Sequence, residues 1–181
     1  MKSIALFGGS FDPPHLGHLE IVDEALKTLE IEKLIVLPAY LNPFKTRSVA
    51  PASLRFKWLQ KIFKHHKNVD VSSFEIDHNQ SIPSIQSVKH FKSLEACRIF
   101  FIIGADNLKK LKQWHSYEEL KLLVTFVIAH RDEIEIPKEY IDLHVDTPVS
   151  STVLRKRMNH TFIPSSVSDE IHKYYKENNG R

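Results

Sequence analysis

Near-continuous apolar runs alternate with segments of helical periodicity along this whole chain. The apolar runs lie at 3–7, 34–37, 99–103 and 123–129, with a less regular one at 69–76 and a short one at 141–145. Spacings of three and four predict helices over 15–29, 53–65, 83–93, 106–112, 116–121, 151–158 and 167–177. Strands that are apolar at nearly every position need cover on both sides, which a parallel sheet between two helical layers provides. We therefore predict an α/β fold, Rossmann-like and doubly wound, with a mainly parallel sheet and helices on both faces.

Size and charge limit what such a chain can do. With 181 residues it is long enough for one domain, expected to span 1–181. The formal net charge is only +3 and the two signs are interspersed, so no nucleic-acid partner is expected. No apolar run approaches the roughly 20 residues of a membrane span, and no signal layout opens the chain. A single cysteine, Cys97, excludes an internal disulfide. These features predict a cytoplasmic protein without membrane association, and they leave open whether it forms a homo-oligomer.

The segment Gly8–His18 follows the first apolar run and leads into the first helical pattern. At such a strand–turn–helix junction, free backbone N–H groups and the positive end of the helix dipole converge. Two glycines let a ligand approach the main chain, and His15 and His18, three residues apart, share one helical face. The segment therefore predicts a phosphate site built from Gly8, Gly9, Ser10, Phe11, His15, Gly17 and His18. Gly17 is expected to leave room there for a flat base or sugar.

Three further segments supply polar groups of complementary chemistry. Ser151 and Thr152 open a helix and Arg155 returns to the same face, which suits a second anion site. Asp106 follows the strongest apolar run, where a carboxylate can accept hydrogen bonds from ribose hydroxyls. Lys45 lies in a proline-rich loop and can neutralise charge that moves during a transfer. Taken singly, an ordinary capped helix and a solvated loop lysine also explain these residues.

Three motifs together resemble one family. The segment G-G-S-F-D-P-P-H-L-G-H, the helix start V-S-S-T-V-L-R and the spacing G-x-D-x-L-x-x-L-x-x-W are similar to motifs of the nicotinate mononucleotide adenylyltransferases, within the nucleotidyltransferase superfamily. The resemblance implies adenylyl transfer from ATP to nicotinate mononucleotide, giving deamido-NAD and pyrophosphate. It implies catalytic roles for His15, His18, Lys45 and Arg155. It implies ATP binding by Gly8, Gly9, Ser10, Phe11, Gly17, Asp106, Ser151 and Thr152, and mononucleotide binding by Trp114, Ser84 and Ile85.

The hypothesis also covers the expected metal ion, the positions that differ from the family motifs, and two alternative functions. No metal-ligand pattern stands out, so Mg²⁺ is expected to arrive with ATP and to be held mainly by its phosphates. The family's S-Y-T-x-x-T-L is altered at 83–88, and Phe44 stands where the family's P-P-H-K has histidine. Arg55 keeps only the arginine of a family motif, and Arg131, after a buried run, is a candidate to flank the adenine. Phosphopantetheine adenylyltransferase and a non-catalytic nucleotide sensor remain as alternatives, which an assay of pyrophosphate release would separate.

Overall fold

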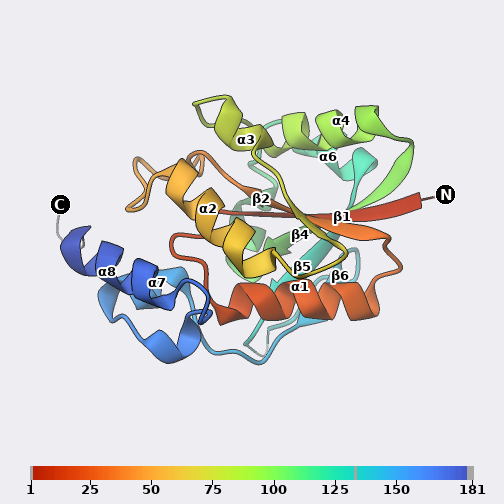
Figure 1. The fold of residues 1–181 in the computed structure, drawn as a ribbon. Helices are drawn as coiled ribbons and strands as arrows, with labels where there is room; N and C mark the ends of the chain where they lie inside the picture. The colour runs from red at the N-terminus through yellow and green to blue at the C-terminus, as the bar shows by residue number, and fades with distance from the viewer. Residues whose placement is uncertain (1, 133, 179–181) are drawn as a thin grey trace.

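A six-stranded parallel sheet forms the centre of the protein (Figure 1). The structure is a computed structural model that describes residues 2–132 and 134–178. The strands are β1 (Lys2–Gly9), β2 (Lys33–Pro38), β3 (Val69–Val71), β4 (Cys97–Gly104), β5 (Thr125–His130) and β6 (Ile141–His144). Their order is β3-β2-β1-β4-β5-β6, and every neighbouring pair is parallel. The chain therefore winds outward in both directions from β1, and the predicted doubly wound α/β fold is confirmed.

Helices cover both faces of this sheet, as Figure 1 shows. One layer contains α1 (Leu16–Thr28), α2 (Ala52–Phe63), α7 (Ser151–Lys156) and α8 (Ser168–Asn178). The other contains α3 (Phe74–Asp77), α4 (Ser84–Leu94), α5 (Leu108–Leu111) and α6 (Tyr117–Leu123). Two 3₁₀ turns, Ala105–Asn107 and His160–Phe162, join neighbouring elements. In the described part of the chain, no helix has the length and apolar character needed to cross a membrane.

Alternation along β1 explains why two helical layers are needed. Ala5 and Phe7 belong to the core beneath α1, α2, α7 and α8, whereas Ile4 and Leu6 belong to the core beneath α4, α5 and α6. All four side chains are at most 3% exposed. Because successive residues of a strand point to opposite faces, a run that is apolar throughout is buried only when both faces are covered.

Two predicted boundaries were wrong. The run at 69–76 was expected to be extended, but β3 ends at Val71 and α3 begins at Phe74. The Asp77 amide bonds to the Ser73 carbonyl at 2.9 Å, so local hydrogen bonds favour a helical turn there over a longer strand. Leu123 was placed in a strand but ends α6, and β5 begins only at Thr125. Short apolar runs do not distinguish the last turn of a buried helix from the start of a buried strand.

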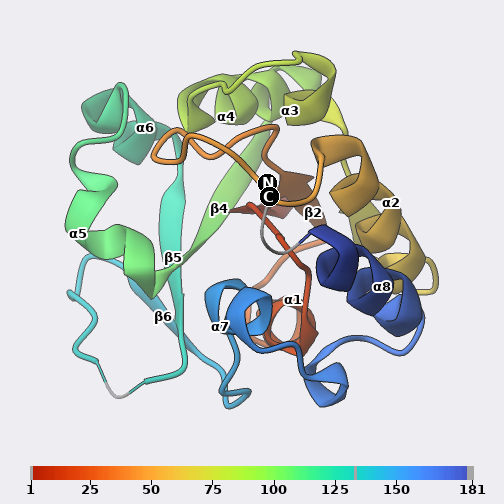
Figure 2. The same cartoon turned by 90° about the vertical axis from the view of Figure 1, so that its left-hand side faces the viewer.

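The carboxyl edge of the sheet is where the strand order reverses. Gly9 ends β1 and Gly104 ends β4, and the chain leaves these neighbouring strands toward opposite helical layers. Figure 2 looks onto this edge, with α1 and α7 close together below it and α5 to one side. A crevice at such a reversal is the usual ligand site of open parallel sheets.

A buried carboxylate, Asp12, joins three remote segments at this edge. Its side chain is 3% exposed. One oxygen accepts the Val49 amide at 2.9 Å, and the other accepts the Ala50 amide at 3.0 Å and the Tyr175 hydroxyl of α8. Burial, with the adjacent Asp12 charge, raises the pKa of Tyr175, which therefore stays a hydroxyl donor. The glycine turn, the proline-rich loop and the last helix are thus held together through one side chain.

Arg55 of α2 performs a similar task with the opposite charge. It is 1% exposed, and its guanidinium donates to the carbonyls of Ala39 at 2.8 Å, Tyr40 at 2.9 Å and Ser10. Its Nε donates to the Ala50 carbonyl at 3.0 Å. A planar guanidinium can satisfy several carbonyls at fixed geometry, so Arg55 has a structural role that its place in a partly matching motif did not indicate.

Tyr175→Phe should lower the free energy of unfolding by about 1–3 kcal/mol, because the buried Asp12 carboxylate loses a hydroxyl donor. Urea unfolding monitored by circular dichroism measures the loss. Tyr174→Phe is the matched control, since the neighbouring hydroxyl makes a single hydrogen bond of 3.2 Å to the neutral Val49 carbonyl. Equal losses in the two variants would contradict a special role for the bond to Asp12.

Candidate active site

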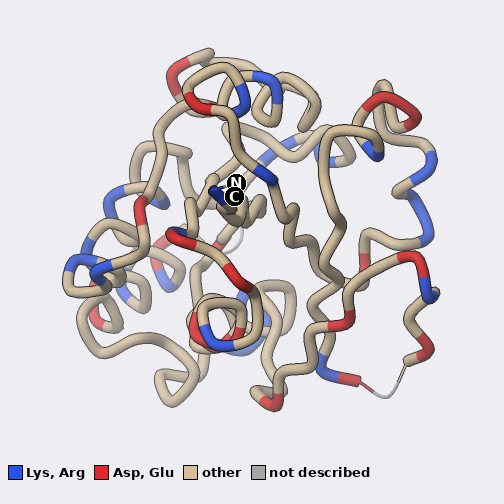
Figure 3. The backbone as a smooth tube through the Cα atoms, turned by 90° about the vertical axis from the view of Figure 1, so that its right-hand side faces the viewer, with Lys and Arg blue, Asp and Glu red and all other residues tan. Residues whose placement is uncertain are grey.

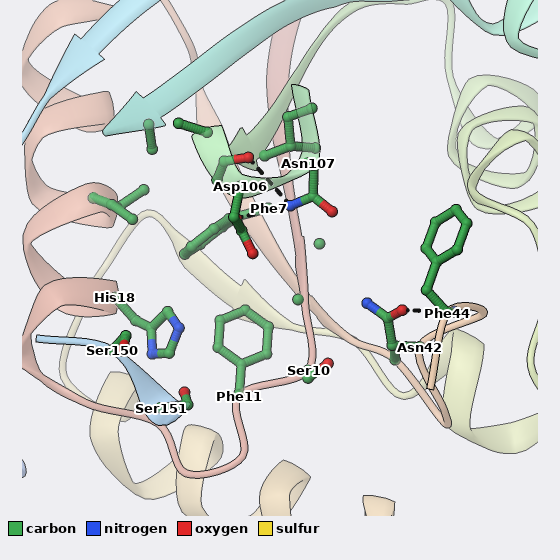
Figure 4. Close-up of a pocket in the computed structure, with 18 of the residues that line it drawn as sticks. Phe7, Ser10, Phe11, His18, Asn42, Phe44, Asp106, Asn107, Ser150 and Ser151 are labelled. Atoms are coloured by element: carbon green, nitrogen blue, oxygen red, sulfur yellow. Dashed lines mark hydrogen bonds between the residues drawn. The ribbon is translucent and has the colours of Figure 1, made fainter. Parts of the chain in front are cut away.

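A cavity of about 990 Å³ opens at the carboxyl edge of β1 and β4. Figure 4 shows Ser10, Phe11 and His18 on one side of it, with Asp106 and Asn107 across from them and Phe44 farther along. The first motif, the start of α7, the end of β4 and the segment before α4 all contribute to its walls. Residues far apart in the sequence therefore form one continuous site.

The glycine turn is shaped by Phe11. This residue has a left-handed backbone with φ of 48°, which is uncommon outside glycine, and its ring is buried. The ring lies against the turn itself, because a Cβ on Gly9 would come within 3.0 Å of it. Phe11 also packs edge-on to Phe7 at 5.3 Å and to His18 at 4.8 Å between ring centroids. Gly9 is therefore needed for the close approach of the Phe11 ring, and Phe11 supports the histidine.

His15 and His18 stack face to face at the start of α1, with centroids 3.7 Å apart and planes 19° apart. Nδ1 of His18 accepts the His15 backbone amide at 3.1 Å, so the neutral ring carries its proton on Nε2. Nδ1 of His15 is buried and has no hydrogen-bond partner within the described residues. A Cβ on Gly17 would lie 3.1 Å from the His15 ring and 3.3 Å from Val149, so Gly17 provides the space for this packing.

Both histidines are held neutral in the free protein. Burial, followed by the nearby charge of Arg131, lowers the pKa of His15 from 6.5 to about 3. Burial also lowers the pKa of His18, helped by His15 and Arg131. A neutral imidazole still donates from one nitrogen, so the pair offers hydrogen bonds to an anion without first needing protonation.

Lys45 and Arg155 are not among the residues that line the cavity, but each contacts a residue that does. The Lys45 ammonium reaches the Ser10 hydroxyl at 3.5 Å, and Arg155 donates to the Asp12 carbonyl and, at 3.1 Å, to the Thr152 hydroxyl. Burial lowers the pKa of Lys45, and the positive charge of Arg155 is the next largest cause. These two cations therefore repel each other through a partly desolvated region, and an anion placed between them would relieve that repulsion.

The start of α7 uses its hydroxyls differently from the prediction. Ser150 is the N-cap, and its hydroxyl oxygen accepts the Val153 amide at 3.2 Å. The Ser151 hydroxyl donates to the Pro13 carbonyl at 2.8 Å and ties α7 to the first motif. Ser151 and Thr152 nevertheless line the cavity. The Ser151 hydroxyl has already donated its proton to the Pro13 carbonyl, whereas the Thr152 hydroxyl accepts from Arg155 and keeps its own O–H as a donor.

Asp106 lies at the cavity wall on the 3₁₀ turn after β4, as predicted. Its carboxylate accepts the Asn107 side-chain amide at 3.2 Å, and the same amide also donates to the Gly104 carbonyl at 3.2 Å (Figure 4). A Cβ on Gly104 would stand 2.6 Å from Oδ1 of Asp106, so a larger residue there would displace this carboxylate. The carboxylate is exposed and keeps acceptor capacity for sugar hydroxyls.

The predicted mononucleotide residues separate into two groups. Trp114 and Ser84 line the cavity, and Trp114 packs edge-on to Phe101 at 6.3 Å between centroids. Its indole nitrogen is buried and makes no hydrogen bond within the described residues. Ile85 instead points into the core beneath α4, is 4% exposed and is not part of the cavity wall. The Ile85 side chain therefore does not reach the cavity, because adjacent helical positions face different sides, and a contact with the mononucleotide through its backbone stays a prediction.

Two further cavity residues had weaker signals in the sequence. Arg131, just after β5, lines the cavity, donates to the Val149 carbonyl and acts on both histidines. Glu75 of α3 lines it as a buried carboxyl, which no motif marked. Along the backbone, positive and negative residues are interspersed (Figure 3).

Comparisons with known proteins identify relatives of this chain. The cytidylyltransferase-like family matches residues 6–157. A probable nicotinate-nucleotide adenylyltransferase from Sulfurimonas denitrificans is 52% identical over 98% of this chain and 97% of its own length. One from Campylobacter fetus is 44% identical over 99% of both chains. The fold is similar to that of the Plasmodium falciparum nicotinic acid mononucleotide adenylyltransferase complexed with NaAD, with a TM-score of 0.81 and 22% identity over 97% of this chain and 98% of that chain.

The free protein should lose stability as pH falls from about 7 to about 5. The pKa of His15 is about 3 in the folded state, whereas an ordinary histidine, as in the unfolded chain, has a pKa of 6.5. The unfolded chain therefore binds more protons than the folded protein between these two values. This group alone should contribute a loss of about 2 kcal/mol at pH 5. Guanidinium unfolding at both pH values should show a smaller loss for His15→Gln than for the parent protein. An identical pH dependence in the two proteins would show that His15 is protonated normally in the fold.

Proposed function

We propose, from the fact that the chain belongs to the cytidylyltransferase-like family and within it to the nicotinate-nucleotide adenylyltransferases, that it transfers the adenylyl group of ATP to nicotinate mononucleotide. The products are deamido-NAD and pyrophosphate, which makes the reaction a step of NAD biosynthesis. One observation carries the proposal. The phosphate-type elements at His18 and Ser10 and the aromatic element at Trp114 line a single cavity, large enough for two nucleotides side by side.

For this reaction the protein needs mainly to align the two substrates and to neutralise their phosphate charge. A mononucleotide phosphate is largely dianionic at neutral pH, since its second pKa is about 6. One of its oxygens attacks the α-phosphorus of ATP and forms the new P–O bond. The bond from the α-phosphorus to the oxygen bridging toward the β-phosphorus then breaks, and pyrophosphate leaves with that electron pair. No protein base and no covalent enzyme intermediate are needed.

The residues supply donors for each part of this transfer. The neutral His18 donates from Nε2 to the transferring phosphoryl group, and the backbone at Ser10 and Phe11 provides N–H groups beside it. Lys45 and Arg155 balance the charge that develops on the leaving pyrophosphate. Asp106 accepts hydrogen bonds from ribose hydroxyls. Pre-set donors of this kind lower the barrier because they need no reorganisation as charge moves.

Magnesium enters this scheme with the nucleotide. Among residues 2–132 and 134–178, no group of three or more His, Cys, Asp or Glu side chains is arranged to hold a metal ion. Mg²⁺ binds phosphate oxygens readily and keeps several waters, so ATP itself suffices as its main ligand. The ion would then neutralise phosphate charge, while the protein's own cations complete the neutralisation.

His18→Ala should lower kcat by about 10²–10³-fold and change the KM for ATP far less, because its hydrogen bond strengthens as charge develops on the transferring group. Steady-state release of pyrophosphate measures both constants. His172→Ala is the control, since that histidine lies on α8 against His160, outside the cavity wall. A near-normal kcat for His18→Ala would remove this residue from the catalytic machinery.

The acceptor should be the acid mononucleotide in clear preference to the amide. Backbone N–H groups near Trp114 and at the start of α4 suit a carboxylate, whereas a carboxamide would turn its own NH₂ toward those donors. Pyrophosphate release should therefore be compared for nicotinate mononucleotide, nicotinamide mononucleotide and phosphopantetheine. We expect kcat/KM for the acid to exceed that for the amide by at least about 10²-fold. Comparable values for acid and amide would refute the preference, and faster turnover of phosphopantetheine would refute the proposed activity.

A further inference from the structure

Glu75 is a carboxyl group buried in the wall of the active-site cavity. It lies on α3, is 9% exposed and lines the same cavity as His18 and Trp114. Among the ion pairs of the described residues, none involves Glu75. An ionised carboxylate in such a place loses its hydration without gaining a cation. Burial accordingly raises the pKa of Glu75, so the neutral acid persists to higher pH than it does for a carboxyl in water.

One oxygen of this carboxyl already has a partner. The Ser87 hydroxyl, itself fully buried on α4, donates to Oε1 of Glu75 at 2.6 Å. Ser84 and Ser87 are three residues apart, so they share one face of α4, and Ser84 lines the cavity. Glu75 consequently adjoins the part of the cavity formed by the start of α4. In a neutral carboxyl the oxygen that accepts from Ser87 acts as the carbonyl, and the proton resides on Oε2.

We propose that Glu75 is a specificity-determining residue for the acceptor, which as a neutral acid donates a hydrogen bond from Oε2 to an oxygen of the bound mononucleotide. The inference rests on the proposed function, since it takes the acceptor to bind at the α4 side of the cavity. A neutral acid offers a donor and tolerates a nearby anionic group, whereas an ionised Glu75 would repel it and offer no donor. Two acceptor oxygens fit this chemistry, the pyridine carboxylate and a ribose hydroxyl.

The charged groups around Glu75 are few. His78, on the same helical turn, is exposed and bonds through Nδ1 to the Phe74 carbonyl at 2.8 Å. His90 of α4 stacks on Phe74 with centroids 3.9 Å apart. Asp77 of α3 accepts the Ser73 hydroxyl at 2.8 Å, and Asp70 is exposed on β3. On α4, Lys89 binds Glu119 and Lys92 binds the Leu123 carbonyl, while Lys33 at the start of β2 pairs with Glu95. The other charged or titratable residues that line the cavity include Asp106, Lys109, His115, Arg131 and Asp132.

The experiment measures the KM for nicotinate mononucleotide from about pH 5.5 to about pH 9, at saturating ATP, in the parent protein and in Glu75→Gln. In the parent protein, KM should rise as Glu75 ionises, by up to about tenfold per pH unit, the limit for one required proton. Glu75→Gln keeps a donor of similar shape that cannot ionise, so its KM at low pH should stay within about threefold of the parent value. The ratio of the two KM values cancels the titration of the substrate phosphate and of the histidines common to both.

Two further variants and a second substrate make the test more specific. Ser87→Ala removes the bond that opposes the rise in the pKa of Glu75, so the increase in KM should begin at higher pH. Glu95→Gln, at the opposite edge of the sheet, should keep the parent profile. With nicotinamide mononucleotide, a profile as steep as that of the acid would assign the bond to the ribose, and a flatter one would assign it to the carboxylate.

The outcomes separate the two proposals. Absence of turnover with any pyridine mononucleotide would overturn the proposed function. Turnover with the same pH profile of KM in the parent protein and in Glu75→Gln would overturn the role of Glu75 alone. Equal rises in KM for ATP and for the acceptor in Glu75→Gln would also overturn it, because they would indicate damage to the cavity as a whole.

Discussion

The buried carboxylate of Asp12 is the interaction on which the site depends. It accepts from two backbone amides of the proline-rich loop and from the Tyr175 hydroxyl near the end of the chain. An unpaired carboxylate in this position would be strongly unfavourable, so the loop, the glycine turn and α8 must come together for the fold to be stable. Arg55 reinforces the same junction through carbonyls, which leaves little freedom for the turn that carries the phosphate-type donors.

This junction fixes buried side chains that are favoured in neutral forms and can bind anionic groups through hydrogen bonds. His15 and His18 stack in a desolvated corner with Arg131 nearby, so protonation is disfavoured and their hydrogen bonds have fixed directions. The cations Lys45 and Arg155 lie behind this corner. Glu75 repeats the pattern on the other wall as a buried acid that is favoured in its neutral form. The cavity therefore combines charge at the phosphate side with neutral donors elsewhere, which suits two nucleotides that must approach each other although both are anionic.

A tight turn in the proline-rich loop directs two neighbouring side chains, Phe44 and Lys45, toward different contacts. The Asn42 side chain accepts the Phe44 amide at 2.9 Å, and its carbonyl accepts the Lys45 amide at 2.9 Å. Lys45 then points toward Ser10, while the Phe44 ring lies beneath Lys110 of α5, with the ammonium 5.1 Å from its centroid. A cation over an aromatic face is an attractive contact that histidine, present at this position in the family motif, would make less favourably. The loop is thereby linked to both walls of the cavity.

The order of residues alone was enough to predict the parallel sheet, its helical cover and the glycine–histidine turn, because each rests on local periodicity and backbone chemistry. It predicted that His15 and His18 would share a face, since three residues along a helix decide that. The sequence did not reveal the bond between Asp12 and Tyr175, which are 163 positions apart, or the burial of Glu75 against Ser87. It also did not reveal that the Ile85 side chain is buried in the core, since a motif gives a position and not the direction of a side chain. Burial and pKa depend on which remote segments pack together, so only the tertiary structure decided which polar groups are neutral, which are tethered and which remain open to a ligand.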